Sequence, residues 1–194
     1  MSYILGNALI NRELIEYDHK LSTPEIVFRI GKRPEVTEVK VIYRSPKITE
    51  KNIRKYHFMV SIGPVIVSPQ LHEVLYSIAS DEIDFYPASV VCKDTTISDY
   101  WAIRPKTLAP CFDMEKSEYE PSAFNPEAYN FSYIELQKEV PYNLHIVRSE
   151  EMPRYIVVDE SIKTACFDTK LTGLLFCSKL DASFQNRECC VSVP

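Results

Sequence analysis

Glycine is scarce in this chain, which has four glycines among its 194 residues. Loops that cradle phosphate groups need clustered glycines, because only a backbone without side chains can approach a phosphate closely. No such cluster occurs, and neither the G-x-S-x-G turn of α/β-hydrolases nor the H-E-x-x-H pair of zinc proteases is present. The sequence therefore gives no sign of a nucleotide-binding loop or of these two kinds of hydrolytic centre.

Histidine is also sparse, with four residues in the whole chain. They are His19, His57, His72 and His145. None of them has a histidine neighbour at the short spacing that is common among zinc ligands. We therefore expect neither a bound metal nor a cofactor.

Long apolar runs and an excess of positive charge are missing as well. The chain has 22 basic and 27 acidic residues and a net charge of −5, whereas nucleic acids and anionic membranes demand basic patches. No apolar run approaches the ~20 residues of a membrane span. The first residues turn acidic quickly and do not resemble a secretion signal. We expect a cytoplasmic protein without nucleic-acid or membrane partners.

The six cysteines lack the C-x-x-C spacing of zinc knuckles and redox motifs. They are Cys92, Cys111, Cys166, Cys177, Cys189 and Cys190. In a reducing cytoplasm such residues behave as small apolar side chains. The sequence predicts six free thiols and no disulfide, including none between the adjacent Cys189 and Cys190.

Two stretches of the chain share one pattern when residues 65–86 are aligned without a gap on residues 156–177. Each begins with three β-branched residues, followed by Ser68 in one copy and Asp159 in the other, which are typical helix N-caps. Pro69 occupies a first helical position, where its missing N–H costs nothing. Apolar residues then recur at helical spacing before a second apolar stretch. The pattern predicts a strand, a capped helix and another strand in both copies.

From these patterns we predict an α+β fold with mostly antiparallel sheet and two similar strand–helix–strand lobes. The predicted organisation has weak N-terminal strands at residues 1–54, a core with both lobes at 55–180 and a tail at 181–194. A short helix is predicted around residues 12–17, and the tail after residue 181 is predicted to be poorly structured.

The stretch CFDMEKSEYE, residues 111–120, holds the densest group of titratable side chains. Its carboxylates are Asp113, Glu115, Glu118 and Glu120. In a strand Asp113 and Glu115 would share a face, and in a helix Glu115 would neighbour Glu118, so either geometry could serve acid–base chemistry or a hard cation. However, Lys116 interrupts the group and the spacing of a calcium loop is absent. The stretch is a solvated acidic loop, a surface for a partner, or a catalytic or metal site.

Aromatic residues gather around this acidic stretch, with eight of them in residues 100–133. They are Tyr100, Trp101, Phe112, Tyr119, Phe124, Tyr129, Phe131 and Tyr133. Aromatics beside charges suit a protein–protein hot spot, although some of these rings could equally fill a core between the lobes. The candidate partner-binding residues are Trp101, Asp113, Glu115, Glu118, Tyr119 and Glu120.

The order of these segments resembles the immunity-protein-11 family of bacterial polymorphic toxin systems. Residues 113–118 match the family's aspartate-x-glutamate-lysine-serine-glutamate run, and Tyr119 follows it. Ile146, Val147 and Arg148 match a later strand, with Val147 in place of the usual phenylalanine. Residues 155–176 match the closing segment, in which Gly173 falls on the family's glycine. The similarity covers about residues 55–178.

The resemblance implies an immunity protein that binds and neutralises a secreted antibacterial toxin, often one delivered by a type VI or contact-dependent system. It implies a cognate toxin as partner, no enzymatic activity and no small-molecule substrate. An acidic antidote would capture a basic, nucleic-acid-gripping toxin faster through electrostatic steering. The alternative is a hydrolase that reverses the toxin's damage with Asp113 and Glu115. That enzyme would need His57 or His145 to converge on the two carboxylates.

Overall fold

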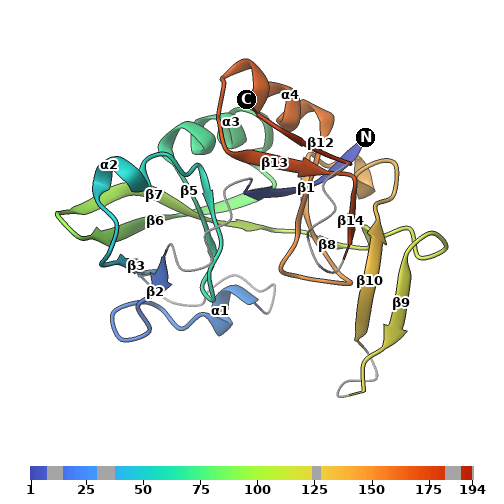
Figure 1. The fold of residues 1–194 in the computed structure, drawn as a ribbon, viewed down its shortest axis with the longest axis horizontal. Coiled ribbons are helices and arrows are strands. Elements are labelled where there is room, and N and C mark those ends of the chain that lie inside the picture. Colours follow the sequence, from blue (N-terminus) through green and yellow to red (C-terminus); the bar gives the residue numbers. More distant parts are fainter. Residues whose placement is uncertain (8–14, 30–37, 124–127, 182–188, 194) are drawn as a thin grey trace.

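The computed structural model describes residues 1–7, 15–29, 38–123, 128–181 and 189–193. In these residues, four α-helices and three β-sheets form a mixed α/β fold rich in strands (Figure 1). The helices are α1 (Ile26–Arg29), α2 (Glu50–Ile53), α3 (Pro69–Ala79) and α4 (Glu160–Asp168).

The first sheet has six strands in the order β2-β3-β6-β7-β5-β4. Their bounds are Glu16–Tyr17 for β2, Val41–Ser45 for β3, Phe58–Met59 for β4, Val65–Val67 for β5, Ile83–Cys92 for β6 and Thr96–Pro105 for β7. The two longest strands, β6 and β7, form an antiparallel hairpin, whereas β3 runs parallel to β6. A parallel pair needs a long connection, and here the connection from β3 to β6 includes both α2 and α3.

The second sheet has the order β15-β13-β1-β12-β11-β8, and a smaller sheet has the order β14-β10-β9. In the second sheet the strands are β1 (Ser2–Asn7), β8 (Leu108–Ala109), β11 (Ile146–Ser149), β12 (Ile156–Asp159), β13 (Leu174–Cys177) and β15 (Cys190–Ser192). The smaller sheet consists of β9 (Glu118–Pro121), β10 (Tyr129–Glu135) and β14 (Lys179–Asp181). Strand β11 is parallel to β8. The predicted prevalence of antiparallel pairing is thus confirmed, but the sheets are mixed.

A strand–helix–strand order is found in both aligned stretches, as β5-α3-β6 and as β12-α4-β13. In both, the two strands lie on either side of one antiparallel strand, which is β7 in the first case and β1 in the second. The predicted N-caps are confirmed. Ser68 Oγ accepts a hydrogen bond from the backbone N–H of Leu71, and the carboxylate of Asp159 accepts from two N–H groups of the first turn of α4.

Each N-cap side chain also contacts a histidine, and each histidine immediately precedes a strand: His57 precedes β4, which pairs with β5, and His145 precedes β11, which pairs with β12. His57 Nδ1 lies 2.8 Å from Ser68 Oγ, and His145 Nδ1 lies 2.8 Å from Asp159 Oδ2. The backbone repeats the arrangement, because Ser68 donates its N–H to the carbonyl of His57 and Asp159 donates to that of His145. The likeness of the two stretches therefore extends upstream of the aligned residues.

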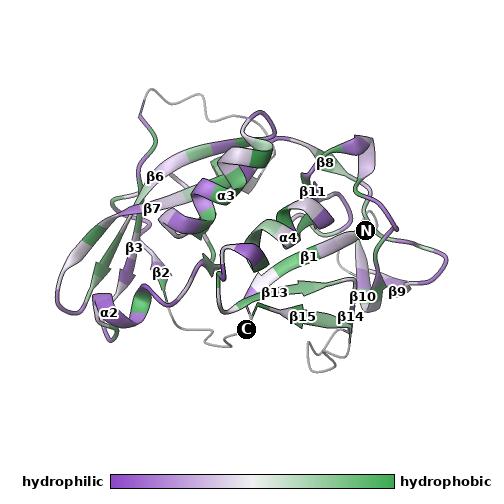
Figure 2. Cartoon of the chain, turned by 90° about the horizontal axis from the view of Figure 1, so that it is seen from above, coloured by the Kyte–Doolittle hydropathy of each residue, from purple (hydrophilic) through white to green (hydrophobic). Residues whose placement is uncertain are grey.

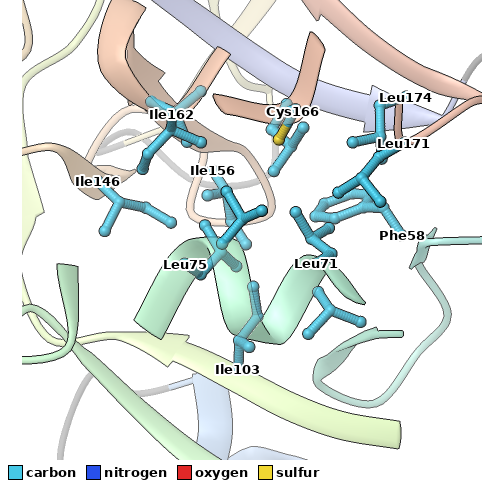
Figure 3. Close-up of a cluster of buried hydrophobic side chains, with 14 of the residues drawn as sticks. Phe58, Leu71, Leu75, Ile103, Ile146, Ile156, Ile162, Cys166, Leu171 and Leu174 are labelled. Atoms are coloured by element: carbon cyan, nitrogen blue, oxygen red, sulfur yellow. The ribbon is translucent and has the colours of Figure 1, made fainter. Parts of the chain in front are cut away.

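Helices α3 and α4 lie side by side, and each carries both hydrophilic and hydrophobic residues (Figure 2). Their apolar faces meet in the largest core cluster, where Leu71 and Leu75 of α3 lie near Ile162 and Cys166 of α4 (Figure 3). All four side chains are fully buried. The helical spacing of the apolar residues thus produces one core shared by the two sheets.

The N-terminal residues depart from the prediction. The helix predicted at residues 12–17 is wrong at its end, where Glu16–Tyr17 is strand β2; residues 12–14 lie outside the described residues. Strand β1 lies inside the second sheet, between β12 and β13. Its own sequence, SYILGN, is weakly patterned, and its partners are more than 140 residues away in the chain. This long-range pairing gives no local signal.

The prediction of six free thiols is wrong, because Cys177 and Cys190 form a disulfide. The tail after residue 181 was predicted to be poorly structured, and this is wrong at residues 190–192, which form strand β15; residues 182–188 lie outside the described residues. Strand β15 pairs with β13 and places Cys190 opposite Cys177, with 4.1 Å between their Cα atoms. Successive residues of a strand point to opposite faces, so only one of Cys189 and Cys190 can reach Cys177. The other four cysteines are free; three are buried, and burial raises the pKa of Cys111 and of Cys166 to about 12.

Candidate functional site

Five of the six candidate residues lie on the protruding β9–β10 hairpin or in the turn that precedes it. The β9–β10 hairpin extends from one end of the molecule, away from α3 and α4 (Figure 1). Glu118, Tyr119 and Glu120 lie on its strand β9, and Asp113 and Glu115 lie in the turn that precedes it. Trp101 is separate from them, because it lies on β7 in the first sheet.

The turn at residues 113–117 is built by backbone hydrogen bonds. Asp113 donates its N–H to the carbonyl of Glu135 on β10, at 2.8 Å, and its own carbonyl accepts from the N–H of Ser117, at 2.9 Å. Glu151 fixes the start of the segment, since its carboxylate accepts from the N–H groups of Cys111 and Phe112. Sequence reasoning missed Glu151, which lies about 40 residues further along the chain.

Asp113 is engaged in this turn by its side chain as well. Its carboxylate forms an ion pair with Lys116 Nζ at 2.5 Å, and this hydrogen bond lowers the pKa of Asp113. A lowered pKa is the opposite of what a general acid near neutral pH requires. His57 and His145 contact the N-caps of α3 and α4 instead of Asp113 or Glu115. The hydrolase alternative needs His57 or His145 beside Asp113 and Glu115, whereas both histidines have other contacts.

The strand β9 is the edge of the small sheet, and all four of its residues are exposed. Tyr119 is paired with Phe131 of β10, and Glu120 with Asn130. Since cross-strand partners share a face and neighbours alternate, the aromatic residues gather on one face of the hairpin and Glu120 lies on the other. A hydrogen-bonded ion pair between Lys179 on β14 and Glu135 on β10, at 3.0 Å, holds the base of the hairpin.

The aromatic face forms a continuous row from the core to the solvent. We call Phe112, Phe131, Tyr119 and Tyr129 the hairpin aromatic row. Ring centroids are 5.0 Å apart for Phe112 and Phe131, 5.4 Å for Phe131 and Tyr119, and 5.0 Å for Tyr119 and Tyr129. The exposed fraction rises along the row from 2% and 9% for the phenylalanines to 38% and 41% for the tyrosines. The outer rings are thus accessible and are supported from below by buried ones.

Trp101 belongs to a second group of rings, the α3 aromatic cluster of His72, Tyr76, Phe85 and Trp101. The indole of Trp101 stacks on the imidazole of His72, with centroids 4.4 Å apart and planes 13° apart. Phe85 meets His72 edge-on at 4.7 Å, and burial lowers the pKa of His72. This cluster was not predicted from the sequence; the i, i+4 spacing of His72 and Tyr76 on α3 is the one local signal that could have indicated part of it.

Among the described residues, no group of three or more histidine, cysteine, aspartate or glutamate side chains is arranged to hold a metal ion. The helices of this part of the chain are too short or too polar to cross a bilayer.

Comparison with models of protein families gives the class to which this chain belongs. The model of an immunity protein family, Imm11, matches residues 7–179. The chain is therefore a member of the Imm11 immunity protein family. The match begins well before residue 55, so it includes the N-terminal strands β2 and β3 that the sequence resemblance had left outside. The comparison with curated proteins gave no match.

Proposed function

We propose that this chain is a cytoplasmic immunity protein that neutralises a cognate secreted toxin by stoichiometric binding, and that the β9–β10 hairpin contacts the toxin. Membership of the Imm11 family supports a toxin-neutralising role and a toxin partner. The observation that supports this contact surface is the hairpin aromatic row, in which two exposed tyrosines pack on buried phenylalanines. Exposed tyrosines supported in this way are typical of interface hot spots.

The charges around these rings favour a basic partner. Glu115, Glu118 and Glu120 are exposed on the hairpin and its preceding turn, and the whole chain carries a net charge of −5. A toxin that grips nucleic acid or nucleotides presents a basic surface, so the two potentials would be complementary and would speed association. Asp113 is less suited to this task, because its charge is already paired with Lys116. Occlusion of the toxin's active site is the simplest mechanism of inhibition.

The edge strand offers side chains to a partner rather than a free ladder of backbone groups. Strand β9 has four residues, two of them glutamates, and ends at Pro121, which has no N–H to donate. Charges, proline and short length are the features by which edge strands avoid pairing with further strands. We therefore place the contact on the tyrosine face and its glutamate rim.

The cytoplasmic location is supported by the free cysteines. Four of the six, Cys92, Cys111, Cys166 and Cys189, are free, as is usual in a reducing compartment. The Cys177–Cys190 pair is the exception, and we expect glutathione and thioredoxin to keep it largely reduced there.

The proposed function is tested by measuring how inhibition of the toxin depends on the molar ratio of chain to toxin. The chain and the toxin encoded beside it are mixed at increasing ratios, and the residual toxin activity and the mass of the complex by light scattering are measured. Inhibition that is complete at a fixed molar ratio, with a complex of matching mass, is the expected result. Protection by traces of the chain, without a complex, would contradict binding and favour the hydrolase alternative.

A further inference from the structure

One covalent bond ties the C-terminal strand to the second sheet. Cys177 is the last residue of β13, Cys190 is the first residue of β15, and the disulfide between them spans a sequence separation of 13. All six cysteines lie in the described residues, and the other four are free. Secreted domains carry dense sets of disulfides, whereas the disulfides of cytoplasmic proteins are usually transient and redox-sensing. A single bond beside four free thiols fits the second kind.

The buried free cysteines are poorly suited to redox chemistry. Cys92, Cys111 and Cys166 are 7%, 1% and 0% exposed. Burial raises the pKa of each of these thiols and so leaves little of the reactive thiolate. Thiol chemistry is therefore directed to the cysteines at the end of the chain.

The two bonded cysteines differ in their accessibility. Cys177 is 2% exposed, because β13 lies between β1 and β15. Cys190 is half-buried on β15, which is the last strand on its side of the second sheet. A small thiol or disulfide in solution therefore reaches Cys190 first, and Cys177 serves as the protected partner.

Strand β15 is a small terminal element that pairs with β13 alone. It has three residues, of which Val191 and Ser192 are exposed. Val193, just after the strand, is the one buried side chain that it adds to the largest core cluster. Terminal elements with so few buried contacts open locally without unfolding of the whole domain. Breaking the disulfide would thus free a strand while the core stays folded.

The disulfide also lies close to the base of the hairpin. Cys177 belongs to the core cluster that contains Phe112 and Phe131 of the hairpin aromatic row, and Cys190 packs against this cluster. Shortly after Cys177 the chain forms β14, which pairs with β10 of the hairpin (Figure 1). The state of the bond is therefore set next to the proposed contact surface.

We propose that Cys177 and Cys190 form a reversible redox latch, which is open in reduced glutathione and is closed by oxidised glutathione to lock β15 onto β13. In the closing reaction the Cys190 thiolate attacks one sulfur of oxidised glutathione, which forms a mixed disulfide and releases one glutathione thiolate. The Cys177 thiolate then attacks the Cys190 sulfur and releases the second. Two protein thiols thereby lose two electrons and two protons, and one oxidised glutathione becomes two reduced ones.

Equilibration of the purified full chain in mixtures of reduced and oxidised glutathione tests the latch. Free thiols are trapped by alkylation and counted by mass spectrometry, and hydrogen exchange of the β15 amides is followed in both forms. The variant is Cys190→Ser, which removes the accessible partner. Cys189→Ser is the matched control, since Cys189 is an exposed free cysteine that adjoins Cys190 and takes no part in the bond.

We expect two thiols to disappear without a gain of glutathione mass as oxidised glutathione increases, and to return in excess reduced glutathione. Cys189→Ser should behave in the same way, and Cys190→Ser should not lose the pair of thiols. The β15 amides should exchange about tenfold more slowly, or more, in the closed form, whereas the amides of α3 should exchange alike in both.

Four results would each overturn the proposal. They are six thiols in excess oxidised glutathione, a bond that survives excess reduced glutathione in the folded chain, loss of a thiol pair in Cys190→Ser, and equal exchange of β15 in both forms. The measurement needs no toxin, so its failure would leave the proposed neutralisation of a toxin standing.

Discussion

The hairpin aromatic row and the α3 aromatic cluster use the same kinds of residue for different ends. In the α3 cluster, Trp101 is half-buried, with His72 stacked on its face and α3 packed above the sheet. In the hairpin, Tyr119 contacts the rings of Tyr129 and Phe131, and 38% of its surface stays exposed. Rings that are covered by their own chain stabilise the fold, whereas rings that are supported from below and open above are available to a partner. The following experiments test this distinction.

Replacement of Phe131 by alanine should have the largest effect on stability. Its ring is 9% exposed and joins the buried Phe112 to the exposed Tyr119, so its loss leaves a cavity under the hairpin. We expect a loss of about 3–5 kcal/mol in the free energy of unfolding. Urea denaturation measures it. A loss below about 1 kcal/mol would mean that the row does not rest on the core.

Replacement of Trp101 by alanine should cost about 3 kcal/mol of stability and little toxin affinity, because its ring is covered by His72 and packs against the largest core cluster. Denaturation and toxin binding are measured on the same variant. Retained stability together with lost toxin binding would contradict the structural role of Trp101, since Trp101 would then be a contact residue.

Replacement of Cys190 by serine tests whether the disulfide stabilises the strands next to the hairpin. The disulfide fixes Cys177, two residues before β14, on which β10 rests. In oxidised protein the change should cost about 2–3 kcal/mol, in keeping with the short loop that the bond closes. Under reducing conditions the variant and the unmodified chain should unfold alike. A thiol count of six in oxidised, denatured protein would show that the bond does not form.

Conversion of Glu115, Glu118 and Glu120 to glutamine should have the smallest effect on the fold, within about 1 kcal/mol, because all three side chains are exposed. Rim charges act mainly on the association rate. The variant should therefore associate more slowly with the toxin at low salt and approach the unmodified chain at high salt. Equal rates at both salt concentrations would show that these carboxylates take no part in capture.

Local signals in the sequence predicted local structure well. Ser68 and Asp159 were identified as helix N-caps because an N-cap depends on a few adjacent residues, and both cap helices as expected. The apolar spacing of α3 and α4 predicted their buried faces for the same reason.

Contacts between distant residues could not be predicted in this way. The partner of Cys177 is set by the pairing of β13 with β15, and the position of β1 by strands at the other end of the chain. Trp101 and the acidic run are near one another in sequence but lie on different elements, because β8 and a turn separate β7 from β9. Whether Trp101 contacts a partner stays a prediction. Tyr129 was noticed as an aromatic residue, but its role follows only from its contact with Tyr119 across the hairpin.

Toxin affinity of the double variant Tyr119→Ala/Tyr129→Ala, beside that of Tyr76→Ala, tests the central claim most directly. Tyr76 is the matched control, since it is 59% exposed but belongs to the α3 aromatic cluster. The account predicts that the double variant keeps its melting temperature and loses about thirtyfold in affinity or more, as hot-spot tyrosines do, while Tyr76→Ala binds like the unmodified chain. Unchanged affinity in the double variant, or a loss confined to Tyr76→Ala, would contradict it and move the interface to α3.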